Sequence, residues 1–319
     1  MENILEIKNL NLFFKGEKCD YQALYDINLS LEKGKIHALA GESGCGKTMT
    51  AMSAMRLLPK TAYIKSGEIF FNGENILEYT ESQMRELRGN KIALIPQDPM
   101  TSLNPLYTVG NQLTEAILTH SKVTKRQALR QAKEVMKLVK IPDAEDKLDF
   151  YPHEFSGGMK QRIIIAMALA CKAELIIADE PTTALDVTIQ KQVMDLLRDL
   201  QKEFGTTVLL ISHDLALLSN YTDTVTVMYS GHIVEQAGIK EFFSNPVHPY
   251  SRALLNSLPS NNSAYKLKTI EGAPPSVQEV ITGCKFHPRC ELAEAGLCDV
   301  ALPELKEKAQ RHFAACLKI

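Results

Sequence analysis

Residues 41–48 read GESGCGKT, in which a glycine is followed after four residues by Gly-Lys-Thr. Glycines let backbone N–H groups turn toward phosphate oxygens, and a helix that follows presents its positive N-terminal end to them. In this pattern Lys47 reaches the β- and γ-phosphates of a nucleotide, and the Thr48 hydroxyl binds Mg²⁺. The alternative is a glycine-rich turn that arose by chance, but a strand and a helix are expected on its two sides. We therefore expect the whole loop to bind phosphate: Gly41, Glu42, Ser43, Gly44, Cys45, Gly46, Lys47 and Thr48.

Two carboxylates, Asp179 and Glu180, end the hydrophobic run LIIADE further along the chain. A phosphate loop needs a second, carboxylate partner for Mg²⁺, best placed at the end of a neighbouring buried strand. Asp179 suits the metal, usually through a water molecule, and Glu180 is placed to polarise an attacking water as general base. Buried strand ends often carry a structural aspartate, so the pair is informative only together with the phosphate loop.

The segments around these residues predict an α/β domain. KIHALA before the phosphate loop reads as a short buried strand, and TMTAMSAMRLLP after it reads as a helix that stops at Pro59. The runs ELIIADE and TTVLLISHD are typical of strands covered on both faces of a parallel sheet. SGEIFFNGENI predicts antiparallel strands near the N-terminus, SGHIVEQAG predicts another short strand, and residues 102–151 have a polar, helical character.

The composition is that of a soluble globular protein. It has 319 residues, of which 45% are hydrophobic and 23% charged, and a formal net charge of −2. This balance gives no reason to expect a nucleic-acid partner, because phosphate backbones recruit clustered Lys and Arg. We expect neither a signal peptide nor a membrane-spanning helix, so a soluble intracellular chain that docks onto membrane proteins is the predicted class.

The stretch EFSGGMKQR precedes LIIADEPTTALD, and the two together resemble the ATP-binding subunit of an ABC transporter. Ser156, Gly157 and Gly158 would open a helix and present a hydroxyl, N–H groups and the helix dipole to a phosphate. The resemblance implies a P-loop NTPase core of ABC type, with an N-terminal antiparallel β subdomain and a helical subdomain at roughly residues 100–160. Residues 1–259 would form this ATP-binding domain, and residues 260–319 a small, loop-rich, Cys-containing C-terminal extension.

Three further residues match motifs of the same family. The resemblance implies that Gln97 touches Mg²⁺ and transmits the nucleotide state, that His213 contacts the γ-phosphate, and that Asp186 crosses a dimer interface. Taken alone, each would be an ordinary loop or strand-end residue. The family also stacks an aromatic side chain on adenine. Phe14 is the predicted residue, and Phe13 and Tyr21 are its competitors.

Three stretches narrow the resemblance to the di- and oligopeptide importers, a branch that includes nickel importers: QDPMTSLNP, YPHEFSGGMKQR and NPVHPYSRALLNSLP. It implies an ATP-hydrolysing subunit on the cytoplasmic face of the membrane. Its partners would be a second, related ATPase, two membrane permeases and an external solute-binding protein. A nickel or metal-chelate importer is the alternative. A soluble ABC ATPase acting on ribosomes or nucleic acid is disfavoured because those chains generally hold two phosphate loops.

Four of the seven cysteines lie in the tail, with five, seven and seventeen residues between successive members: Cys284, Cys290, Cys298 and Cys316. Simple zinc sites usually contain a pair separated by two to four residues, and the tail has none. The resemblance implies that these four cysteines bind a [4Fe–4S] cluster. A zinc site with His287 or His312 as rival ligands, or four free thiols, remain open. Cys19, Cys45 and Cys171 are scattered, and no metal is expected at them.

Overall fold

The computed structural model describes residues 2–183, 185–258 and 270–319. The chain divides into two compact units. The first comprises Met1–Glu32, Ile36–Leu77 and Ile211–Ile319, and the second comprises Lys33–Lys35 and Glu78–Leu210. Among the described residues, no helix is long and apolar enough to cross a membrane.

The first unit contains a four-stranded antiparallel sheet in the order β2-β1-β4-β5. Apolar side chains of β1 and β2, among them Leu10, Leu12 and Leu24, are fully buried and form the core on one face of this sheet. Asn72 and Gly73 make the turn between the last two strands, as the Asn-Gly pair predicted. The strands are β1 (Asn3–Phe14), β2 (Tyr21–Glu32), β4 (Ala62–Phe71) and β5 (Glu74–Asn75).

The first unit also holds five strands that place the phosphate loop, in the order β11-β12-β10-β9-β3. All five residues of β3 (Ile36–Ala40) are buried, and the strand pairs in parallel with β9 (Thr224–Tyr229). Antiparallel pairing then joins β10 (His232–Gly238) to β9, and β12 (His312–Ala314) to β10, with β11 (Lys306–Ala309) at the edge. The helices of this unit are α1 (Lys47–Met55), α8 (Leu215–Tyr221), α9 (Ile239–Ser244), α10 (Pro249–Asn256) and the 3₁₀ turn η4 (His287–Arg289).

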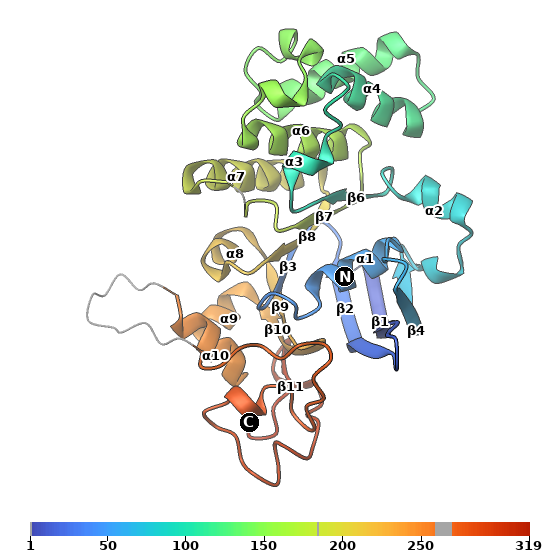
Figure 1. The fold of residues 1–319 in the computed structure, drawn as a ribbon. Helices are drawn as coiled ribbons and strands as arrows, with labels where there is room; N and C mark the ends of the chain where they lie inside the picture. The colour runs from blue at the N-terminus through green and yellow to red at the C-terminus, as the bar shows by residue number, and fades with distance from the viewer. Residues whose placement is uncertain (1, 184, 259–269) are drawn as a thin grey trace. The chain divides into compact units, whose positions relative to one another are not determined.

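The second unit combines buried strands with a group of helices, of which α4, α5 and α6 pack on one another (Figure 1). Its β6 (Ile92–Ile95) and β7 (Leu175–Asp179) run in parallel, and β8 (Thr207–Ser212) follows β7 in the sheet order. The helices are α2 (Glu81–Leu87), α3 (Pro99–Ser102), α4 (Val109–His120), α5 (Lys125–Leu138), α6 (Gly157–Ala170) and α7 (Val187–Phe204). The 3₁₀ turn η1 (Ile76–Glu78) lies at the sequence boundary of the two units, and η2 (Asp146–Asp149) and η3 (Pro152–Glu154) belong to the second unit.

The observed elements confirm the predicted fold class, with one difference of detail. The helix after the phosphate loop ends at Met55 rather than at Pro59, because Arg56 adopts a left-handed conformation with φ 50° that closes the helix. Part of the tail joins the unit that holds the phosphate loop, since β12 pairs with β10. The predicted boundary at residue 259 lies outside the described residues and stays a prediction.

Candidate functional site

The backbone of the phosphate loop has the conformation that its glycines predict. Gly41, Gly44 and Gly46 have φ angles of 146°, 80° and 108°, which L side chains rarely adopt. At Gly46 there is also no room for a side chain, because a Cβ atom would lie 2.7 Å from Cδ2 of Leu24. Successive turns of this kind point N–H groups into a common concavity that binds anions. α1 begins directly afterwards, with no side-chain cap on its N-terminus.

Lys47 is buried in this loop, with 5% of its surface exposed. Its Nζ donates hydrogen bonds to the carbonyl oxygens of Gly41, at 2.8 Å, and Glu42, at 3.0 Å. A buried ammonium group is tolerated only where it is hydrogen-bonded, and these carbonyls meet that need. The loop therefore holds a positive charge in place at the point where a phosphate would enter.

A second group of side chains holds the loop from outside, and sequence reasoning did not single it out. The guanidinium of Arg289 binds both carboxylate oxygens of Glu42, at 2.7 and 3.0 Å. The backbone N–H of Glu42 donates to the hydroxyl of Tyr250, at 3.0 Å. Burial raises the pKa of Tyr250, so its hydroxyl stays neutral. The only sequence signal was indirect, since Arg289 lies in FHPRC beside a tail cysteine and Tyr250 in the HPYSRALL stretch.

In the second unit, the structure brings Gln97 and Glu180 together. The Glu180 carboxylate oxygen Oε2 accepts hydrogen bonds from Nε2 of Gln97, at 3.1 Å, and from the hydroxyl of Thr183, at 2.9 Å. Glu180 has a φ of 46°, an unusual conformation for a residue with a side chain and one that tends to occur at functional sites. Asp179, the last residue of β7, is 5% exposed. Thr183 was not among the predicted residues, although it lies in the quoted PTTALD stretch.

The predicted signature residues open α6. Ser156 is the N-cap, and its hydroxyl accepts a hydrogen bond from the N–H of Met159, at 3.4 Å. Gly158 packs so tightly on α7 that a Cβ atom would lie 2.5 Å from Cγ2 of Ile189, whereas Gly157 has more room. Asp186 caps α7 by accepting from the N–H groups of Thr188 and Ile189. These caps explain the local structure, and the roles of these residues toward a nucleotide stay predictions.

The remaining predicted nucleotide contacts stay predictions as well. His213 is exposed and directly follows β8. Phe14 lies opposite Tyr21 in the pairing of β1 with β2. Phe13 stacks on Tyr63, with ring centroids 6.0 Å apart, and Nζ of Lys65 lies 4.7 Å from the centroid of the Phe13 ring. These contacts do not decide which aromatic ring would meet adenine.

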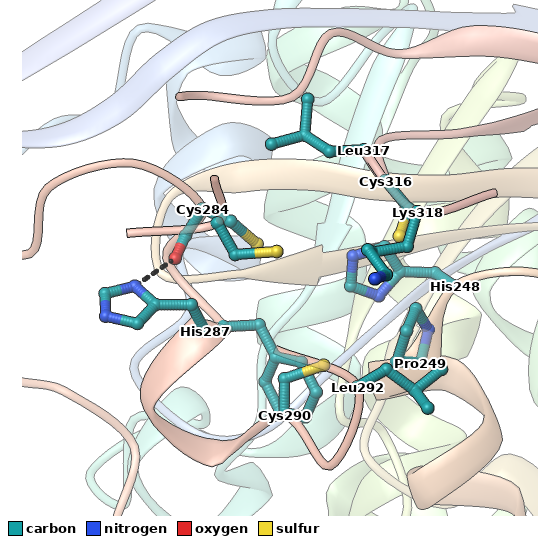
Figure 2. A pocket seen from close by; sticks show the side chains of 11 residues that line it. His248, Pro249, Cys284, His287, Cys290, Leu292, Cys316, Leu317 and Lys318 are labelled. Atoms are coloured by element: carbon teal, nitrogen blue, oxygen red, sulfur yellow. Dashed lines mark hydrogen bonds between the residues drawn. The ribbon is translucent and has the colours of Figure 1, made fainter. Parts of the chain in front are cut away.

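The four tail cysteines line one small cavity of about 20 Å³ together with His248 and His287 (Figure 2). Burial, followed by smaller contributions from neighbouring thiols, raises the pKa of Cys284 and of Cys290. In the ranges 2–183, 185–258 and 270–319, however, no three Cys, His, Asp or Glu side chains are arranged to hold a metal ion. The donor type therefore fits a metal or cluster site, but in the described part of the chain these side chains are not arranged around a single metal ion.

His312 was the wrong candidate for a rival ligand in the tail. It does not line the cysteine cavity, because its Nε2 lies 2.7 Å from Oε1 of Glu235 and both side chains are fully buried. The same carboxylate accepts hydrogen bonds from the N–H groups of Val247 and His248. This pair fastens β12 to β10 and to the segment that leads into α10. His287 does line the cavity, and its Nδ1 lies 2.9 Å from the carbonyl oxygen of Cys284.

Comparison with known proteins agrees with these features. The ABC transporter family model matches residues 24–183, and the model for the oligopeptide/dipeptide transporter C-terminal region matches residues 234–298. The probable peptide ABC transporter ATP-binding protein y4tR of Sinorhizobium fredii is 49% identical over 98% of this chain and 94% of its own length. The oligopeptide transport ATP-binding protein OppD of Escherichia coli is 43% identical over 99% of this chain and 93% of its own.

Among solved structures, cbiO1 from Clostridium perfringens, described as part of the ABC transporter complex cbiONQ, superposes with a TM-score of 0.66. It is 28% identical, and the match covers 77% of this chain and 92% of cbiO1. The phosphate loop, the two family models and these near full-length relatives all agree. The chain therefore belongs to the ABC transporter ATP-binding family, in the branch that carries the oligopeptide/dipeptide transporter C-terminal region.

Proposed function

We propose that this chain hydrolyses ATP to power the import of di- and oligopeptides through a membrane ABC transporter. The observation that carries the proposal is the presence, in one chain, of a phosphate loop and of the oligopeptide/dipeptide C-terminal region at residues 234–298. The relatives from Sinorhizobium fredii and Escherichia coli are named for peptide and oligopeptide transport, which favours peptides over nickel or a metal chelate as the cargo.

In this proposal the phosphate loop binds the ATP phosphates through its backbone N–H groups and through Lys47. Thr48, Asp179 and Gln97 offer oxygen ligands, the type that Mg²⁺ prefers. Bound Mg²⁺ would neutralise charge on the phosphates during transfer. Glu180 orients the attacking water and accepts a proton from it as the water oxygen bonds to the γ-phosphorus and the bond to ADP breaks. His213 contacts the γ-phosphate, and Phe14 stacks on adenine.

The rest of the machinery would come from partner subunits. Ser156, Gly157 and Gly158 would bind the ATP held by a second, related ATPase, with Asp186 at the interface between the two. Such a composite site needs two ATPase subunits, so the isolated chain is proposed to be a poor ATPase. Two membrane permeases and an external solute-binding protein complete the transporter, and the chain works on the cytoplasmic face of the membrane.

The transport function can be tested with the purified transporter in lipid vesicles. Together with its partner ATPase, permeases and binding protein, the chain is expected to hydrolyse ATP faster when the binding protein carries a peptide, because solute delivery favours the closed ATPase dimer. The measurement is phosphate release and uptake of a labelled peptide, with binding protein lacking solute as the control. Stimulation by nickel and not by any peptide would replace the peptide proposal with the metal-importer alternative.

We also propose that Cys284, Cys290, Cys298 and Cys316 hold a [4Fe–4S] cluster, supported by the common cavity that they line. Protein purified without oxygen is expected to contain iron and acid-labile sulfide at about four each per chain. Protein that holds the cluster should be brown. Cys290→Ser should remove this colour, whereas Cys19→Ser, which changes an exposed cysteine outside the tail, should leave the colour unchanged. One tightly bound zinc per chain would indicate a structural zinc site, and metal-free protein with four alkylated tail thiols would refute both.

A further inference from the structure

Arg289 and Glu42 are 247 positions apart in the sequence but form a direct contact in the structure. Glu42 is the second residue of the phosphate loop, and Arg289 immediately precedes a tail cysteine, Cys290. The pair is bidentate, and the Arg289 side chain is only 6% exposed against 25% for Glu42. A buried, two-pronged contact of this kind fixes both geometry and charge, unlike an exposed surface ion pair.

Four hydrogen bonds to groups within the protein hold the Arg289 guanidinium. Besides binding Glu42, Arg289 donates from Nε to the carbonyl oxygen of Glu271, at 3.0 Å, and from Nη1 to the hydroxyl of Tyr229, at 3.3 Å. Its guanidinium carbon also lies 5.8 Å from the centre of the Tyr229 ring. Contacts within the protein therefore hold the Arg289 side chain in place, and in this position it supports the phosphate loop.

Aromatic packing gives this support a rigid base. Phe286, which lies in the tail between Cys284 and Cys290, packs against Tyr229 and Tyr250, with ring centroids 5.2 Å away in each case. The rings of Tyr229 and Tyr250 are 4.7 Å apart. Both tyrosines are fully buried, and the Tyr250 hydroxyl accepts the N–H of Glu42. The tail therefore supports the phosphate loop in two ways. Arg289 binds Glu42 directly, and Phe286 packs against Tyr250, whose hydroxyl accepts the N–H of Glu42.

The charge of Glu42 explains why the loop needs this support. A carboxylate in a loop that binds phosphate repels the incoming anion, and the repulsion between charges is strong where they are partly shielded from water. The guanidinium group of Arg289 balances the negative charge of Glu42 and holds its carboxylate on the tail side of the loop. Without it, the carboxylate would be unbalanced, and Lys47 would be the nearest available cation within its own loop.

We propose that Arg289 is a positioning residue for nucleotide binding. It neutralises the carboxylate of Glu42 and holds it on the tail side of the phosphate loop, so that the loop can bind the phosphates of ATP. The C-terminal segment is then a working part of the nucleotide site. This inference rests on the proposed ATPase function and deepens it. It predicts an effect on ATP affinity and on the KM for ATP, with kcat at saturating ATP little changed, because Arg289 does not touch the reacting atoms.

The test measures ATP affinity of the full chain by isothermal titration with Mg²⁺ present. Arg289→Ala is expected to weaken binding by about tenfold or more, the scale of one uncompensated charge near the phosphates. Adding Glu42→Gln to the same protein is expected to restore most of the affinity, since the unbalanced carboxylate is then gone. Recovery in the double variant is the result that a merely structural role of Arg289 would not produce.

The matched control is Arg311→Ala. Arg311 is also a C-terminal arginine that reaches back to an N-terminal glutamate, with Nη2 3.4 Å from Oε2 of Glu32, but its side chain is 65% exposed. Its loss should leave ATP affinity unchanged. Circular dichroism melting confirms that each variant is folded. If Arg289→Ala does not fold, Arg289→Gln, which keeps a hydrogen-bond donor without the charge, takes its place with the same expected loss and recovery.

Equal ATP affinity of the wild type and the folded Arg289 variant would overturn the inference and leave the ATPase proposal intact. A loss of affinity that Glu42→Gln does not recover would also overturn it, because Arg289 would then act through the fold or through a direct phosphate contact. Failure of the wild-type chain to bind ATP with Mg²⁺ would instead refute the proposed function itself.

Discussion

Glu180→Gln is expected to lower ATP turnover of the assembled transporter by at least about a hundredfold, the usual scale for loss of a general base. Glutamine has nearly the same size, and its amide oxygen can still accept from Gln97 and Thr183 as the Oε2 atom of Glu180 does. It cannot take the proton of the attacking water. ATP binding should therefore survive while chemistry stalls, and the ATPase pair should accumulate in its ATP-bound dimer.

The measurement is phosphate release under saturating ATP, together with nucleotide binding by filter retention. Glu174→Gln provides the control. Glu174 directly precedes β7, the strand that Glu180 directly follows, and it forms an ion pair with Lys91. Both side chains of that pair are partly exposed, so its loss should cost little and leave turnover unchanged. Near-normal turnover of the Glu180→Gln transporter would remove Glu180 from the role of general base.

Lys47→Ala should abolish ATP binding at micromolar nucleotide, with a loss of affinity of at least about a hundredfold. The change removes a buried positive charge from the loop and with it charge-assisted hydrogen bonds, each worth about 1.5–3 kcal/mol. Two such bonds to phosphate oxygens correspond to a hundredfold or more in the dissociation constant. The contrast with Glu180→Gln is diagnostic, because one variant loses binding and the other loses only chemistry.

Isothermal titration of ATP with Mg²⁺ into the full chain checks this result. Lys60→Ala, which removes an exposed lysine of the same unit, is the matched control and should bind ATP as the wild type does. Circular dichroism melting separates lost binding from lost folding. Tight ATP binding by a folded Lys47→Ala protein would show that the predicted phosphate loop is not the nucleotide site.

Much of the fold followed from local sequence patterns. The Asn-Gly turn of β4 and β5 and the fully buried β3 and β7 are each specified by a few consecutive residues. Such elements depend on backbone preference and on the spacing of apolar residues, which are visible without any partner. The end of α1 was placed too late because a left-handed Arg56 has no clear sequence signal.

The chemistry-bearing motifs were also determined by the sequence, because each is a contiguous stretch whose backbone does the work. GESGCGKT specifies its own turn, and LIIADE specifies a buried strand with carboxylates at its end. The hydrogen bond between Gln97 and Glu180 was not predicted from the sequence. Eighty-three positions separate these residues, and no local preference encodes such a contact.

Only the tertiary structure decided what supports the phosphate loop. Arg289 and Glu42 are 247 positions apart, and their pairing depends on how β9, α10 and the tail pack within one unit. The same holds for His312, which the sequence offered as a metal ligand and which packing assigns to Glu235. A charged side chain takes the partner that folding brings within hydrogen-bond distance, and a linear sequence lists the candidates without their distances.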